Sequence, residues 1–184
     1  AIYALAAQEL ANTAAMPGDA VWFLRRAILT TPDPNLSILI AYFSLVAEHG
    51  SIEDIADLED VIGGLDGQRA ILQRVMDEGS LPTDPALLRA EFFYQFGGLC
   101  TTRGRRELAE AALLKALDIH PDHPMACNDL GYYLVEDGRN QALAERLLVR
   151  AYTLRPDSHN VIDSFAWLRY MQGRIEDWSD PVTG

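Results

Sequence analysis

The strongest constraint on how this chain folds is an internal repeat of about 34 residues. The best copy spans residues 90–123 and places Phe93 and Gly97 in its first half, followed by Ala109 and Pro121. Large apolar residues at fixed spacing, a small residue in each half and a closing proline are typical of a helix–turn–helix unit. One such hairpin cannot bury its apolar face alone, so the repeat predicts that successive hairpins stack on one another.

Two further copies follow the best one along the chain. Residues 124–158 form a second unit, in which Gly131, Ala144 and Pro156 keep the spacing and one extra residue lengthens the turn. Residues 159–184 match over the first helix only. We interpret them as a partial repeat or a capping helix.

The amino-terminal half follows the period less closely. Residues 1–34 resemble one unit, residues 35–68 a degenerate repeat, and residues 69–84 an extra helix with a loop. The stretch 63–83, where the repeat phase is lost, has three interpretations: a connecting helix, a half-repeat, or a hinge between two sub-arrays. We expect residues 1–184 to form a single array of repeats.

Small side chains predict where the paired helices cross. Two antiparallel helices approach closely only where a small residue lies at the crossing, so we expect Gly97 to face Ala109 and Gly131 to face Ala144. No run alternates apolar and polar residues in the way a half-buried strand does. The predicted fold class is therefore all-α, a solenoid of antiparallel helix pairs.

The charge of the chain argues against several classes of partner. Its 184 residues carry a formal net charge of −12, whereas a nucleic-acid reader needs a basic face and an anionic membrane attracts basic helices. No stretch approaches the ~18 consecutive apolar residues of a membrane span. The chain begins at Ala1 with no signal peptide and no methionine, which indicates a processed or excised piece. We expect a soluble protein, and the sequence does not decide between the cytoplasm and the periplasm.

Residues that suggest chemistry have simpler structural interpretations. His120, His123 and Cys127 lie close in sequence without the spacing of a zinc motif. Cys100 and Cys127 fall at core positions, where buried free thiols are common. The acidic residues within 53–60 are interpreted as a solvated helix face, and no phosphate-binding loop is present. We expect no catalytic residue, no metal and no cofactor, and hence no enzyme.

These motifs resemble the tetratricopeptide repeat (TPR) family, and the runs NDLGY at 128–132 and DSFAW at 163–167 resemble its bacterial members. The resemblance implies a right-handed superhelical solenoid whose first helices line a concave groove. In the family this groove holds an extended peptide or a helix of a partner protein. Transferred by position, the groove residues are Tyr94, Gly98, Thr101, Asn128, Tyr132, Val135, Asp163, Trp167 and Tyr170.

The charges at these positions indicate the kind of partner. Glu91, Glu136 and Asp163 would repel an acidic tail, so we expect a neutral or basic protein or peptide ligand. The function implied by the resemblance is that of a scaffold or adaptor. Two alternatives stay open: a regulatory or substrate-recruiting domain of a larger enzyme, and a self-association module that forms a homo-oligomer.

Overall fold

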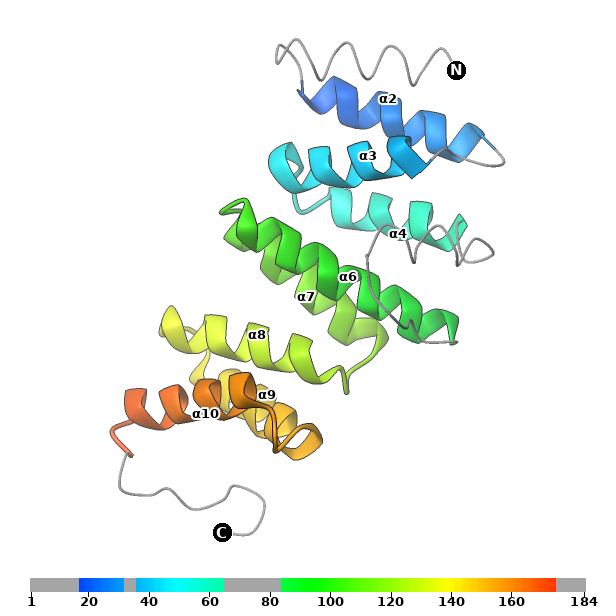
Figure 1. Ribbon diagram of the computed structural model, residues 1–184. Coiled ribbons are helices and arrows are strands. Elements are labelled where there is room, and N and C mark those ends of the chain that lie inside the picture. The colour runs from blue at the N-terminus through cyan, green and yellow to red at the C-terminus, as the bar shows by residue number, and fades with distance from the viewer. Residues whose placement is uncertain (1–16, 32–35, 65–83, 175–184) are drawn as a thin grey trace. The chain divides into compact units, whose positions relative to one another are not determined.

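Every element in the part of the chain that the structure describes is an α-helix, as the sequence predicts. The computed structural model describes residues 17–31, 36–64 and 84–174 (Figure 1). The chain divides into two compact units, Ala1–Ala112 and Leu113–Gly184. Most of the extra helix predicted at 69–84, and the last part of the partial repeat at 159–184, lie outside the described residues.

Within its described residues, the first unit contains five helical segments. They are α2 (Pro17–Thr30), α3 (Leu36–His49), α4 (Asp54–Gly64), α6 (Pro85–Thr102) and the beginning of α7 (Arg106–Ile119). Helix α2 packs against both α3 and α4, and α3 also packs against α6. Each helix therefore covers the apolar face of a neighbour, which is what a stack of hairpins requires.

Aromatic side chains join α3 to α6. The ring of Phe43 lies 4.9 Å from that of Phe92, and Phe92 also stacks on Phe96 within α6. Tyr42, which precedes Phe43 in α3, is fully buried with its ring 5.6 Å from that of Phe43. Arg25 of α2 forms an ion pair with Asp57 of α4 at 2.8 Å. Apolar burial thus holds the helices together, while charged residues connect their edges.

The last two residues of α4 are both glycines, Gly63 and Gly64. Helix α4 runs through both residues to Gly64. A glycine inside a helix costs only about 1 kcal/mol relative to alanine, and the preceding Val61 and Ile62 are buried. Packing of this last turn outweighs the poor helix propensity of the two glycines.

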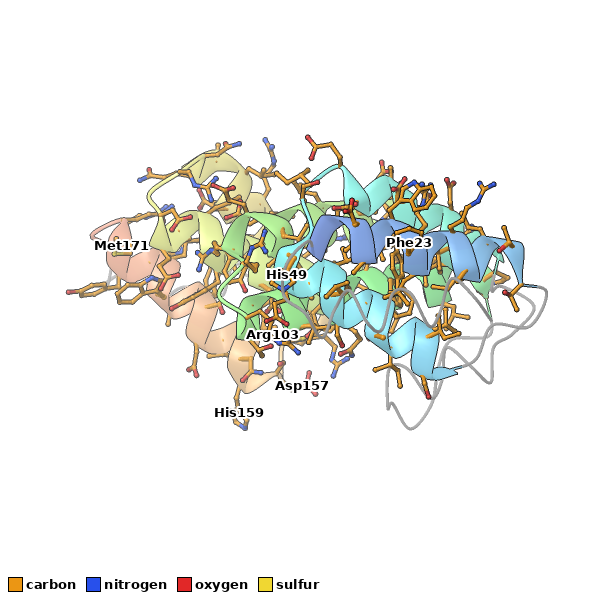
Figure 2. All side chains as sticks on the ribbon, turned by 90° about the horizontal axis from the view of Figure 1, so that it is seen from above. Phe23, His49, Arg103, Asp157, His159 and Met171 are labelled. Carbon is orange, nitrogen blue, oxygen red and sulfur yellow. The ribbon has the colours of Figure 1, made fainter. Side chains whose placement is uncertain are left out.

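Arginine side chains fix the carboxyl end of α3 to the α6–α7 turn. Arg105 donates to the backbone carbonyls of Glu48 and, at 2.6 Å, Gly50. Arg103 forms an ion pair with the Glu48 carboxylate at 3.0 Å, and Figure 2 labels it near His49, the last residue of α3. The Arg105 guanidinium satisfies carbonyls that a helix end leaves without a partner.

The second unit contains α8 (Pro124–Glu136), α9 (Gln141–Leu154), α10 (His159–Met171) and the end of α7. Helix α8 packs against α9, and α10 packs against both. Cys127, Ala151 and Val161, one from each of the three helices, share a fully buried cluster. The hairpin α8–α9 and the following helix α10 therefore have the arrangement that the repeat predicts.

Gly131 lies at the crossing of α8 and α9, but its neighbours differ from the expected one. A Cβ atom at this position would lie 2.8 Å from Cγ of Leu148 and 3.3 Å from Cβ of Leu147. The expected partner, Ala144, is not among the nearest atoms, although it is fully buried. Helices α8 and α9 therefore do approach closely at Gly131, as predicted. The residues of α9 nearest to it lie one turn after Ala144.

Glycines with positive φ angles follow three of the described helices. Gly104, Gly138 and Gly173 follow α6, α8 and α10 with φ angles of 70°, 63° and 68°. In all three turns the next backbone N–H donates to the carbonyl five residues earlier at 2.9 Å, the bond that defines a Schellman motif. The same chain reversal thus recurs at the spacing of the sequence repeat.

Candidate protein-binding surface

The residues predicted to line a groove belong to three helices and differ widely in exposure. On α6 of the first unit, Tyr94 is half-buried, whereas Gly98 and Thr101 are exposed. The Thr101 hydroxyl donates to the carbonyl of Gly97 at 2.9 Å, which satisfies its hydrogen within the helix. At these positions, α6 therefore exposes mainly a glycine and a threonine and little apolar surface.

On α8 the predicted residues are largely buried. Asn128 is only 4% exposed, and its amide Nδ2 donates to Asp129 at 3.0 Å. Its carbonyl oxygen is buried with no partner among the described residues. Val135 is also buried, and Tyr132 is half-buried with its hydroxyl 3.5 Å from Glu136. Of these three residues, Tyr132 exposes the most surface.

On α10 the predicted residues are all exposed and form one continuous surface. Asp163, Trp167 and Tyr170 are spaced by four and three residues, so they share one face of the helix. Trp167 is 37% exposed and Tyr170 57% exposed, and their rings stack at 5.3 Å with planes 21° apart. This face already holds two aromatic rings in a fixed arrangement.

Met171, which the repeat pattern did not indicate as a groove residue, extends the same face. It is 49% exposed and lies one turn after Trp167. Figure 2 labels Met171 and His159 near the two ends of α10. Its four-residue spacing from Trp167 was the sequence signal that could have placed it on this face. Spacing alone, however, does not distinguish an exposed methionine from a core methionine. We call Asp163, Trp167, Tyr170 and Met171 the α10 face.

The opposite side of α10 holds this helix in the second unit. Val161, Phe165 and Leu168 are buried at helical spacing against the neighbouring helices. Tyr152 of α9 lies with its ring 5.6 Å from that of Phe165. Because these residues take up the apolar contacts available to α10, the rings of the α10 face are left pointing away from the core.

A buried arginine completes the attachment of α10 to α9. Arg169 is 9% exposed, donates to Glu145 at 3.0 Å and to Gln172 at 3.1 Å, and lies 4.8 Å above the Phe165 ring. Its positive charge is therefore directed toward α9 and not toward the α10 face.

Two titratable groups near the start of α8, Asp129 and His123, interact with residues of the same helix. The carboxyl of Asp129 is desolvated by burial, which raises its pKa, although the Asn128 hydrogen bond and His123 act in the opposite direction. His123 is buried and its Nδ1 accepts a hydrogen bond from the backbone N–H of Ala126, which makes it the N-cap of α8. These groups have structural partners within the first turns of one helix.

The two cysteines lie in surroundings that favour the neutral thiol. Burial raises the pKa of Cys100 to about 12 and that of Cys127 to about 11, and both are free and buried. A thiol in such surroundings is protonated at neutral pH and is a poor nucleophile. Across residues 17–31, 36–64 and 84–174, no cluster of histidine, cysteine and acidic side chains is arranged to hold a metal ion.

The first unit contains a cleft of about 600 Å³ between the α3–α4 and α6–α7 turns. Its lining carries two basic residues, Arg105 and Arg106, and two acidic ones, Glu53 and Glu107. The guanidinium of Arg105 is occupied by the carbonyls at the end of α3. Balanced charge and an occupied arginine give this cleft no clear preference for a ligand.

The sequential antiparallel helix pairs define the class of this chain as an all-α helical-repeat protein, and their arrangement is similar to that of TPR-type repeats. A sequence comparison matches a TPR repeat-containing protein of Pseudomonas aeruginosa, which is 39% identical over 57 residues. These residues make up 31% of this chain and 10% of the relative, so the match spans about a tenth of that protein's length. No family model matches the chain, and no solved structure matches it significantly.

TPR repeats generally mediate protein–protein interactions and are usually parts of non-catalytic scaffolds. Within the described residues, no helix has both the length and the apolar character needed to cross a membrane.

Proposed function

We propose that this chain is a protein-interaction module whose α10 face, together with Tyr132 of α8, contacts a segment of a partner protein. The observation that carries this proposal is the exposed, mutually stacked pair Trp167–Tyr170. Tryptophan and tyrosine are enriched among the residues that dominate binding energy at protein interfaces. They lose little conformational entropy on binding, and here the stack already restricts them.

The surroundings of the pair support a neutral or basic ligand. Asp163 lies one turn before Trp167, and Glu136 lies one turn after Tyr132. Both are exposed carboxylates, and an acidic segment placed on these helices would meet like charges. The partner segment that fits is therefore uncharged or cationic.

Site-specific photocrosslinking tests this proposal. A photoreactive residue at Met171 would leave the Trp167–Tyr170 stack intact, and the same residue at Leu29 of α2 serves as control because both side chains are 49% exposed. In a lysate of the source organism, we expect a discrete adduct from position 171, identified by mass spectrometry, and none from position 29. The adduct should disappear when Trp167 is replaced by alanine. Equal adducts from both positions, or an adduct indifferent to Trp167→Ala, would contradict the proposal.

A further inference from the structure

We infer that the α10 face recognises an arginine side chain of the partner, an inference that rests on the proposed function and specifies its ligand chemistry. The face combines two features that a guanidinium group needs. One is an exposed aromatic stack, and the other is a carboxylate one helical turn away.

The aromatic stack supplies the first feature. An arginine placed over the exposed side of Trp167 is attracted by the negative face of the indole, and tryptophan is the best aromatic residue for this contact. The guanidinium group is planar and weakly hydrated, so it stacks on a ring with less loss of solvation than the ammonium group of lysine. Because Tyr170 already stacks on Trp167 at 5.3 Å, the indole does not have to be ordered when the ligand arrives.

The carboxylate of Asp163 supplies the second feature. Residues four apart on a helix have Cβ atoms about 5–6 Å apart, so a guanidinium above Trp167 can also reach Asp163. Asp163 is exposed, and no ion pair with a basic side chain is found for it in the described part of the chain. A carboxylate can accept two parallel hydrogen bonds from arginine, a geometry that lysine cannot match.

The charges around the α10 face also favour a cationic ligand over a second copy of the chain. No exposed residue of α10, from His159 to Met171, is a lysine or an arginine. The one arginine of this helix, Arg169, is buried and pairs with Glu145. The full chain carries a net charge of −12, so two copies repel each other. An arginine-bearing segment is attracted by the same charge.

A matched control exists on α2. Trp22 is 55% exposed and lies edge-on to Phe23, with ring centroids 5.0 Å apart. One turn after it comes the exposed Arg26, and one turn before it the exposed Asp19. Trp22 is thus an exposed tryptophan of similar aromatic character whose neighbouring carboxylate is offset by an arginine, so it should attract a guanidinium group less than Trp167 does.

Binding of defined peptides tests the inference. We would titrate the full chain into fluorescein-labelled Gly-Ser peptides that carry two arginines, two lysines or two citrullines, at physiological ionic strength, and follow anisotropy. Citrulline keeps the shape of arginine and removes its charge. We expect the arginine peptide to bind about tenfold more tightly than the citrulline peptide, with lysine between them.

Variants assign the effect to the α10 face. We expect Trp167→Leu and Asp163→Asn each to reduce the preference for arginine by about fivefold or more, while Trp22→Leu and Asp157→Asn leave it unchanged. Helicity by circular dichroism should stay the same, because all four side chains are exposed. A Tyr170→Leu variant, which removes the second ring and keeps the indole, should weaken binding less than Trp167→Leu.

Several outcomes would overturn the inference. Equal affinity for arginine and citrulline peptides, an equal loss with Trp22→Leu, or a concentration-dependent dimer that shields Trp167 would each do so. If the arginine preference fails while the Met171 photoadduct forms, the ligand chemistry is wrong and the proposed function stands. If the adduct fails as well, both are wrong.

Discussion

Gly131 has no room for a side chain, because a Cβ atom there would lie 2.8 Å from Cγ and 3.0 Å from Cδ2 of Leu148. We expect Gly131→Ala to lower the free energy of unfolding by about 1–3 kcal/mol, since the leucine or the backbone must move. Gly98 in α6 is the control, because a Cβ atom added there would meet no neighbouring atom within 4 Å. There, alanine should raise stability by roughly 0.5–1 kcal/mol. Urea midpoints for both variants check this, and a stable Gly131→Ala protein would contradict it.

Asp129 should make stability depend on pH. Burial raises its folded-state pKa, so the ionised form is disfavoured in the folded chain. This penalty is absent below the unfolded pKa of about 3.9 and grows as the pH rises through the raised folded value. We expect Asp129→Asn to raise the urea midpoint at pH 7 and to change it little near pH 3. The exposed Asp157→Asn should show no such difference, and an equal gain at both pH values would refute the assignment.

The sequence predicts some residues well and others poorly, for physical reasons. It identified Gly131 because only a close helix approach explains a glycine within an apolar run, yet it named Ala144 where Leu147 and Leu148 are the neighbours. A repeat fixes which helices cross, but the contact atoms depend on rotation of the helix by a fraction of a turn. The burial of Asn128 was not predictable either, because the identity of a polar residue does not show whether neighbouring helices cover it.

At the scale of helices, α10 is fixed to α9 by a polar contact in addition to apolar burial. Arg169 donates to Glu145 at 3.0 Å and lies over Phe165. We expect Arg169→Met to lower the free energy of unfolding by about 1 kcal/mol, a modest value because Glu145 remains partly solvated. Arg146→Met, on the exposed side of α9, should cost less. Thermal unfolding of both variants checks the difference, and equal losses would show that the contact contributes nothing.

Helix pairing was predictable from sequence because its determinants are local. The glycines that end α6, α8 and α10 have the positive φ angles that other residues avoid, so they mark the turns in sequence and in structure alike. Contacts between distant turns were not predictable. Arg105 binds the carbonyls of Glu48 and Gly50, and nothing in the period of the repeat pairs this arginine with that helix end.

At the scale of the whole molecule, exposed aromatic residues and a large net charge have opposite effects on self-association. The rings of the α10 face favour contact between copies, whereas a net charge of −12 at pH 7 opposes it. The charge approaches zero near the isoelectric point of about 4.6. The repulsion should therefore be lost as the pH falls toward that value.

Light scattering across this pH range tests which effect is stronger. We expect a monomer at pH 7.4 that is independent of concentration, and an increasing mass as the pH approaches 4.6. If the α10 face makes the contact, Trp167→Asp should suppress the increase more than Trp22→Asp, because each variant adds the same charge at an exposed tryptophan. A stable dimer at pH 7.4 would mean that attraction between copies exceeds their charge repulsion, and would support the self-association module as the function of this chain.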